Sequence, residues 1–187
     1  MPVLEIKIAP HPVLREKTSE VAVFDTKLHT LLDDMFETML AANGIGLAAP
    51  QIGISQQIAI IDVSGDYVER PLITSGTDIA PEQHLHKERL ELINPEIVNG
   101  GAKVSSEEGC LSIPDYRDSI SRHESVTVKA RDRHGRPFQL SATELLAFAI
   151  QHEVDHLNGI LFVDHLSRLK KTFFRKWAVK NLGSADL

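Results

Sequence analysis

The sequence predicts an α+β fold, because two helical patterns and several short strand-like runs follow one another without a regular strand–helix–strand rhythm. The chain has 187 residues, of which 42% are hydrophobic and 25% are charged, so it is long enough to bury one core without cross-links. We therefore expect residues 1–187 to form a single domain.

The first helix is predicted over residues 25–43. Its apolar side chains recur at spacings of three and four residues, which is typical of a helix with one buried face. These side chains are Leu28, Leu31, Leu32, Met35, Phe36, Met39 and Leu40. Asp25 is a candidate N-terminal cap and Gly44 is a plausible stop.

Strand signals lie in the middle of the chain. Residues 57–63 (QIAIIDV) form a short, isoleucine-rich run, and residues 126–130 alternate between apolar and polar side chains. A turn signal at residues 133–135 and an apolar run at residues 138–140 then predict a hairpin. Residues 64–87 contain glycines, prolines and scattered charges, which predicts a long surface loop.

The second helix is predicted over residues 141–157. Ser141 and Glu144 have the spacing of a capping box, in which each side chain satisfies a backbone N–H of the first turn. The asparagine and glycine at residues 158–159 predict the end of this helix.

The last stretch, residues 165–187, differs in charge from the rest of the chain. The whole chain has a formal charge of -6, which argues against general binding to DNA, whereas this stretch carries about +5. Its basic residues are Arg168, Lys170, Lys171, Arg175, Lys176 and Lys180, and its apolar residues include Leu166, Leu169, Phe173 and Trp177. Either it is an amphipathic helix that packs on its own domain, or it directs this end of the molecule towards a polyanion.

The expected compartment is the cytoplasm. No run approaches the roughly 18 consecutive apolar residues of a membrane-spanning helix, and the N-terminus lacks the features of a signal peptide. The single cysteine, Cys110, cannot form an internal disulfide, so nothing indicates an oxidising compartment.

The motif QHEVDH in the second predicted helix points to a metal site. His152 and His156 are four residues apart, so their imidazoles lie on one face of the helix and can bind one divalent ion. Glu153 follows the first histidine and is a candidate general base. The alternative is that these residues form a solvated polar stripe, but the helix around them is largely apolar.

A third ligand is needed, and Cys110 is the best candidate. Phe162 occupies the position where the extended HExxHxxGxxH pattern has histidine, and no glutamate follows Glu153. Asp164 and His165 are possible ligands, but they lie close behind the helix. A set of one cysteine and two histidines leaves a coordination position for water, which is typical of a catalytic metal.

Residues 44–51 (GIGLAAPQ) contain two glycines and two alanines, so another group can approach this backbone closely. A phosphate site is disfavoured, because the strip has no lysine and no GxGxxG spacing. A helix end followed by a tight turn is the structural alternative. In a functional interpretation, Gln51 donates its amide to an oxyanion.

Three strips of this sequence, in this order, resemble the motifs of peptide deformylases: GIGLAAPQ at residues 44–51, EGCLS at residues 108–112 and QHEVDH at residues 151–156. The resemblance implies mostly antiparallel strands packed around a central metal-binding helix, with a C-terminal helix. It also implies removal of the N-formyl group from the N-terminal formylmethionine of new polypeptides, with release of formate. The implied cofactor is one divalent ion per chain, Fe2+ in the cell, with Zn2+, Ni2+ or Co2+ able to replace it.

The resemblance also implies roles for individual residues. Gln51 and the backbone N–H of Leu111 would form the oxyanion hole, and Gly46 would help to hold the peptide backbone. Arg117 and Glu108 would support the site. The pocket for methionine would be lined by Leu145, Phe148 and Ala149.

Other functions fit this sequence less well. A peptidase that cleaves internal bonds is disfavoured, because no third ligand follows the helix. A ribosome-binding module with a structural metal would need a fourth ligand. The basic residues 165–187 resemble C-terminal helices of deformylases that contact the ribosome, so we expect such a contact, with the protein a monomer that binds neither DNA nor membranes.

Overall fold

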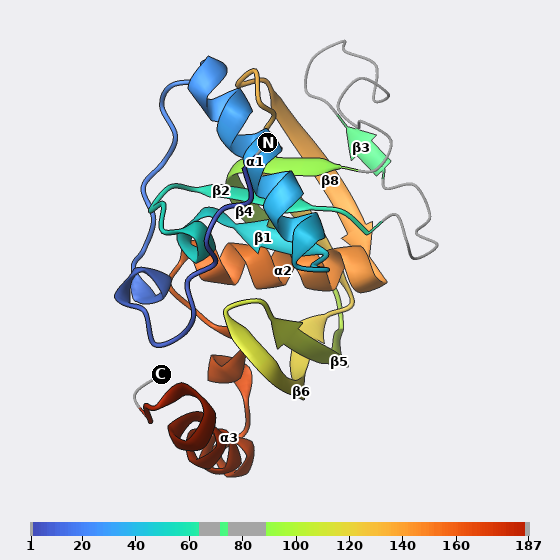
Figure 1. The fold of residues 1–187 in the computed structure, drawn as a ribbon. Helices are drawn as coiled ribbons and strands as arrows, with labels where there is room; N and C mark the ends of the chain where they lie inside the picture. Colours follow the sequence, from blue (N-terminus) through green and yellow to red (C-terminus); the bar gives the residue numbers. More distant parts are fainter. Residues whose placement is uncertain (1, 64–71, 75–88, 186–187) are drawn as a thin grey trace.

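The computed structural model describes residues 2–63, 72–74 and 89–185. It confirms the α+β class, since antiparallel sheets and helices pack together (Figure 1). The strands of the main sheet, in spatial order, are β1 (Gly46–Ala48), β2 (Ile58–Ile61), β4 (Leu90–Gly100), β7 (Ser125–Arg131), β8 (Pro137–Thr143) and β3 (Leu72–Thr74). A separate hairpin is formed by β5 (Lys103–Cys110) and β6 (Ile113–His123).

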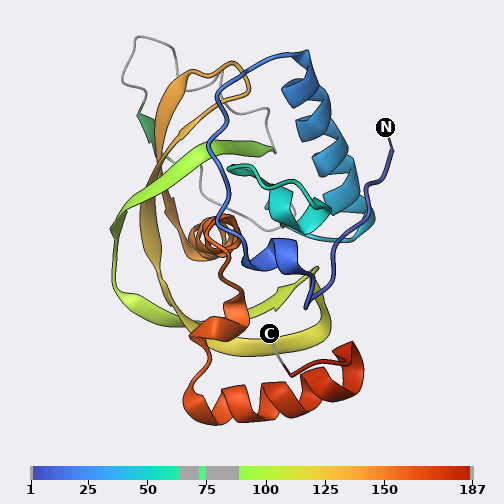
Figure 2. The same ribbon diagram turned by 90° about the vertical axis from the view of Figure 1, so that its left-hand side faces the viewer.

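The helices α1 (Thr26–Ala41), α2 (Glu144–Leu157) and α3 (Arg168–Leu182) occupy different places in the fold. Figure 2 looks along α2, which lies at the centre of the molecule between the curved main sheet and the β5–β6 hairpin. Helix α1 covers one side of the sheet, and α3 lies beyond the hairpin at the far end of the molecule. Short 3-10 helices occur at Pro12–Arg15, Ala49–Ile52 and Phe162–His165.

Helix α1 follows the sequence prediction closely. The carboxylate of Asp25 accepts hydrogen bonds from the backbone N–H groups of Lys27 and Leu28, as expected for a capping residue. The buried face of α1 joins a cluster with β2 and the strip around β1. At its end the chain turns through Asn43, which has a left-handed φ of 54°, and so leads into the glycine-rich strip.

The predicted start of the second helix was wrong. Ser141 lies in β8, opposite Thr127 of β7, and helix α2 begins only at Glu144. Thr143 occupies the N-terminal cap without a side-chain hydrogen bond. The cross-strand pairing of β7 and β8 therefore extends through the three residues that the capping-box spacing assigned to a helix. The predicted end is confirmed, because Asn158 caps the helix and Gly159 adopts a positive φ of 72°.

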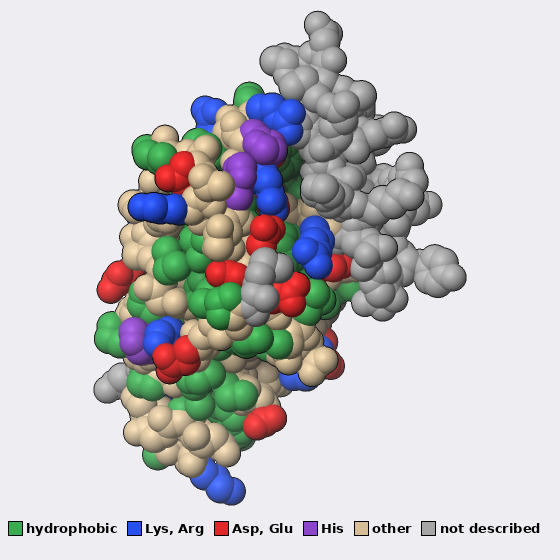
Figure 3. Space-filling model, turned by 45° about the horizontal axis from the view of Figure 1, so that its top comes forward, with side chains coloured by type: hydrophobic (Ala, Val, Ile, Leu, Met, Phe, Trp, Pro, Cys, Tyr) green, Lys and Arg blue, Asp and Glu red, His purple; other side chains and the backbone are tan. Residues whose placement is uncertain are grey.

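The predicted hairpin at residues 126–140 is confirmed as β7 and β8, which pair in antiparallel register. The predicted loop at residues 64–87 lies outside the described residues except for β3, which pairs with β8 and so forms a strand there. None of the described helices is long and apolar enough to cross a membrane. Figure 3 shows side chains of both charges interspersed with apolar ones over one face of the molecule.

Helix α3 packs on the hairpin through a face that includes only part of the predicted apolar residues. Phe174 is 4% exposed and Ala178 is fully buried, whereas Leu169 and Phe173 are 67% and 59% exposed. The ring of Tyr116 in β6 lies 4.8 Å from that of Phe174. The apolar residues predicted to pack therefore divide between a docked face and an outer face.

Candidate metal centre

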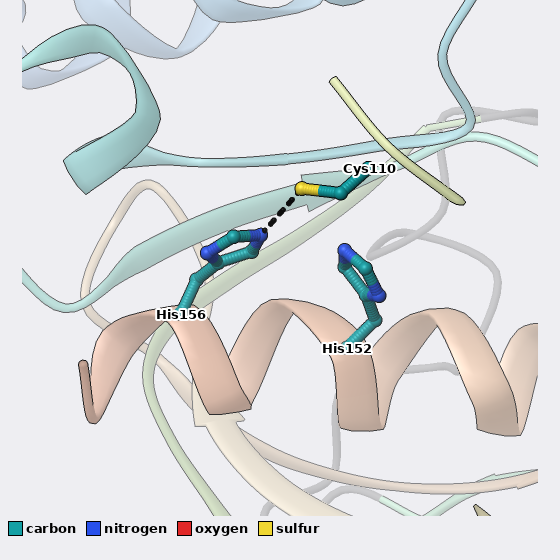
Figure 4. A group of neighbouring side chains, drawn as sticks. All are labelled: Cys110, His152 and His156. Carbon is teal, nitrogen blue, oxygen red and sulfur yellow. Dashed lines mark hydrogen bonds between the residues drawn. The ribbon is translucent and has the colours of Figure 1, made fainter. Parts of the chain in front are cut away.

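Three side chains from two elements converge on one point. Helix α2 presents His152 and His156 one turn apart, and Cys110 comes from the end of strand β5. Figure 4 shows both imidazoles pointing towards the cysteine sulfur. The Cys110 Sγ atom lies 3.2 Å from His156 Nε2, and one ligand atom from each residue lies within 4.8 Å of the others. The structure thus brings together the three predicted ligands.

The donor set fits a divalent metal ion. Metal–nitrogen and metal–sulfur bonds of about 2.0–2.3 Å in a tetrahedral site place neighbouring ligand atoms roughly 3.5 Å apart, which these side chains can adopt with small rotations. Burial, followed by the charge of His152, holds the pKa of His156 well below 6.5, so its ring is neutral and has a lone pair for a metal. His156 Nδ1 is also buried without a hydrogen-bond partner among the described residues.

The other predicted candidates for a third ligand have different partners. Asp164 accepts hydrogen bonds from Arg15 and from the backbone N–H of Leu161. His165 Nε2 lies 2.7 Å from the carboxylate of Asp155. Neither residue belongs to the cluster of possible ligands, which leaves Cys110 as the third member.

His152 is oriented by a buried carboxylate behind it. Its Nδ1 lies 2.8 Å from Glu108 Oε2, which leaves Nε2 for a metal. Burial alone would lower the pKa of His152, but hydrogen bonds with Cys110 and Glu108 raise it well above 6.5 in the metal-free protein. The ring of Phe162 stacks on the same imidazole with the ring centres 6.0 Å apart. The histidine is therefore fixed from two sides.

Glu108 is itself held by Arg122, whose side chain is 4% exposed. Arg122 donates from Nε and Nη2 to the two oxygens of Glu108 at 2.8 and 3.0 Å, and from Nη1 to Asp155 on α2. Burial tends to raise the pKa of Glu108, but the hydrogen bonds with His152 and Arg122 lower it to about 2. Sequence reasoning missed Arg122 and Asp155, because neither belongs to a local pattern that predicts their meeting.

Glu153 lies beside the cluster in a buried position against the glycine-rich strip. A Cβ atom placed on Gly46 would lie 2.2 Å from Glu153 Oε1, so the absence of a side chain at Gly46 makes room for this carboxyl. Burial is the largest of the effects that raise the pKa of Glu153, to about 7. Its Oε2 atom has no hydrogen-bond partner among the described side chains and backbone. Such a carboxyl can both take up and release a proton near neutral pH.

Gln51 also lies next to the group of possible ligands. It lies in the short 3-10 helix Ala49–Ile52, and its Nε2 atom is 3.6 Å from Cys110 Sγ. Leu111 follows the cysteine in the turn between β5 and β6, with its side chain against Gly44. A Cβ at Gly44 would lie 2.8 Å from Leu111, so this close approach also depends on a glycine.

A cavity of about 670 Å³ opens beside these groups. Its walls include every predicted catalytic and substrate-binding residue, together with two of the three predicted ligands, Cys110 and His152. These predicted residues are Gly46, Gln51, Leu111, Leu145, Phe148, Ala149 and Glu153. Arg117, predicted to support the site, lies at the rim, where it pairs with Glu107 at 3.3 Å and both side chains are exposed.

Comparisons with known proteins agree with this geometry. The sequence model of a family described as polypeptide deformylase matches residues 3–172. A peptide deformylase of Heliobacterium modesticaldum is 46% identical over 166 residues, which cover 89% of this chain and 95% of that protein.

Solved structures resemble the whole chain as well. A peptide deformylase from Legionella pneumophila is 43% identical, with a TM-score of 0.81 and coverage of 96% of this chain and 95% of the other. A peptide deformylase from Synechococcus elongatus in complex with actinonin is 38% identical, with a TM-score of 0.80 and coverage of 100% and 91%.

Proposed function

The chain belongs to the polypeptide deformylase family, and from this premise we propose how its residues remove the N-formyl group from formylmethionine at the start of new polypeptides. It is a hydrolase that acts on nascent chains and releases formate. The observation that carries the proposal is the convergence of Cys110, His152 and His156 with the buried carboxyl of Glu153 at one cavity.

We propose that Cys110, His152 and His156 hold one divalent metal ion per chain. Such an ion supplies Lewis acidity, which polarises a carbonyl oxygen and lowers the pKa of water at an open position. The resemblance to the family favours Fe2+ in the cell. The same donors also suit Zn2+, Ni2+ or Co2+, so the metal supply decides which ion is bound.

In this proposal Glu153 moves the proton. Its Oε2 atom accepts a proton from water and later delivers it to the methionine nitrogen as formate leaves. The raised pKa of about 7 supports this role, because a carboxyl with that pKa exchanges protons readily at cellular pH.

The remaining cavity residues bind and orient the substrate. Gln51 Nε2 and the backbone N–H of Leu111 would donate hydrogen bonds to the formyl oxygen as it gains charge. The backbone of Gly46 would bind the peptide. The methionine side chain would lie against an apolar wall of α2, formed by Leu145, Phe148 and Ala149.

Formate release tests this assignment. Protein made without oxygen and loaded with iron or nickel is given formyl-Met-Ala-Ser, with the acetylated and the unblocked peptides as controls. We expect formate from the first peptide only, and loss of formate in Cys110→Ser. Cleavage of an internal bond in the unblocked peptide would instead favour a peptidase.

We also propose that the chain is a single domain over residues 1–187 and a cytoplasmic monomer. Sedimentation equilibrium tests the monomeric state.

We further propose that α3 contacts the ribosome. The outer face of α3 supports this contact, since exposed Leu169 and Phe173 lie among basic residues. Deleting residues 169–187 would also remove the buried Phe174, so charge reversal at Lys176 and Lys180 is a cleaner test. We expect weaker co-sedimentation with ribosomes and unchanged turnover of small peptides, and unchanged co-sedimentation would contradict the contact.

A further inference from the structure

The side-chain amide of Gln51 is held at both of its ends. Its Oε1 atom accepts a hydrogen bond from the backbone N–H of Ala48 at 2.8 Å. At the other end, Nε2 lies 3.3 Å from the hydroxyl oxygen of Ser112 and 3.6 Å from the sulfur of Cys110. Gln51 and Ser112 are both buried, so water does not compete for these bonds.

These partners determine which end of the amide is oxygen. A backbone N–H can only donate, so the end next to Ala48 must be the carbonyl oxygen. The NH2 group of Gln51 therefore faces Ser112 and the metal centre. One of its hydrogens is directed at the Ser112 hydroxyl oxygen, which leaves the other directed at Cys110.

The turn that carries the Ser112 hydroxyl is held by a separate contact. Ser112 is 0% exposed and lies in the turn between β5 and β6. Its carbonyl oxygen accepts a hydrogen bond from the backbone N–H of Ala9 at 2.9 Å. The N-terminal segment thus holds the turn that carries the hydroxyl, and the hydroxyl holds one hydrogen of the Gln51 amide.

We propose that Ser112 is a positioning residue for the deformylase reaction, which acts by holding the Gln51 amide with one N–H aimed at the metal centre. The inference rests on the proposed role of Gln51 as a donor to the formyl oxygen. Without the Ser112 hydroxyl, Oε1 keeps its bond to Ala48, but the NH2 end loses its acceptor and turns away from the reacting oxygen. Because this oxygen gains charge only as the reaction proceeds, misplacing its donor lowers kcat more than it changes KM.

A double-mutant cycle tests the inference in iron- or nickel-loaded protein. Ser112→Ala should lower kcat about tenfold with KM within about twofold of the parent. Gln51→Ala should lower kcat by at least as much, and Ser112→Ala should have no further effect in that background. Thr38→Val removes an equally buried hydroxyl from α1, and we expect it to leave kcat unchanged.

The outcomes separate the two proposals. Full activity in Gln51→Ala would overturn the role of Gln51 itself. An impaired Gln51→Ala with an equal additional loss from Ser112→Ala would overturn the positioning role alone. If the alanine variant does not fold, Ser112→Cys provides the same cycle with a weak sulfur acceptor, and an intermediate kcat that depends on Gln51 is expected.

A second readout does not depend on turnover. In 15N-labelled, zinc-loaded protein, the side-chain amide resonances of Gln51 are identified by their loss in Gln51→Ala. In Ser112→Ala we expect these resonances to shift and their hydrogens to exchange faster with solvent. Unchanged resonances together with an unchanged kcat would overturn the inference.

Discussion

Helices α2 and α3 are similar in length, yet they are held in the fold in opposite ways. Helix α2 is enclosed by the sheet and the β5–β6 hairpin, and two of its side chains, His152 and Asp155, pair with the buried residues Glu108 and Arg122 of the hairpin. Helix α3 is attached along one face, with basic and apolar side chains outward. The comparison teaches that the side chains of α2 that converge on the site are held by groups from other elements, whereas α3 is held along a single face.

The largest effect should come from removing the guanidinium that ties α2 to the hairpin. Arg122→Met removes the guanidinium from the buried carboxylate of Glu108 and the partly buried one of Asp155, which keep only histidine partners. This should lower the free energy of unfolding by about 3 kcal/mol. Because Glu108 orients His152, metal affinity should fall about 10–100-fold. Urea unfolding and competition with a chelator measure the two effects.

The matched control is Lys170→Met, which removes the ion pair between α3 and Asp118. Both side chains of that pair are partly exposed, so the loss should be about 1 kcal/mol or less, with no change in metal affinity. Equal losses in the two variants would contradict the comparison between the helices.

Substitutions at two neighbouring phenylalanines of α3 should also differ strongly in their effect on stability. Phe174→Ala removes a buried ring and should cost about 3 kcal/mol of stability, whereas Phe173→Ala, on the outer face, should cost less than about 0.5 kcal/mol. Thermal unfolding followed by circular dichroism compares the two. Similar melting temperatures would mean that α3 does not dock through the face described above.

On α2, Glu153→Ala should cut turnover about 100-fold or more while metal content stays near normal, because the proposed role of the carboxyl is proton transfer and it lies outside the group of three possible ligands. Formate assays and elemental analysis of the same sample measure both quantities. If metal and turnover are lost together, the proton role of Glu153 is not supported.

The smallest effect concerns the pH dependence of α3 docking. Burial tends to raise the pKa of Asp118, but hydrogen bonds with Lys170, Ser119 and Tyr116 bring it below the ordinary value of 3.8. The ionised carboxylate therefore stabilises the docked helix above about pH 4, and this contribution disappears as the pH falls through the lowered pKa.

The chain has one tryptophan, Trp177, and its ring lies 4.8 Å from Tyr116 at the docked face. Its fluorescence therefore reports on docking. Asp118→Asn should weaken docking by less than about 1 kcal/mol at pH 7, and the difference between variant and parent should disappear as the pH falls through the lowered pKa of Asp118. A difference that grows in acid would reverse the expected sign.

More of the candidate site than of the surrounding fold could be predicted from the sequence. The three possible metal ligands could be predicted from a local motif and from the number of ligands that a metal needs, since Cys110 was the best remaining candidate for the third position. The start of α2 was predicted wrongly, because the spacing of Ser141 and Glu144 suits a helix cap but their backbone continues a strand. The start of α2 is set instead by the pairing of β8 with β7, which continues to Thr143. The spacing of two residues at a helix cap carries no information about this pairing.

The network behind His152 and the docked face of α3 show the same limit. Arg122 and Asp155 are 33 residues apart and meet only because the hairpin lies over α2. In α3 the apolar spacing indicated an amphipathic helix but not its docked face. Phe173 and Phe174 are adjacent and equally apolar, and the aromatic surface of Tyr116 determines which of them is buried.

The close contact between Gly46 and Glu153 has a consequence for resistance to inhibitors. A compound that binds the backbone of Gly46 contacts a position where any added side chain would overlap the Glu153 carboxyl, since even a methyl group would lie 2.2 Å from it. A substitution that expels the compound would therefore displace the carboxyl that we propose moves the proton. Resistance arising at this position would therefore come with a loss of deformylase activity.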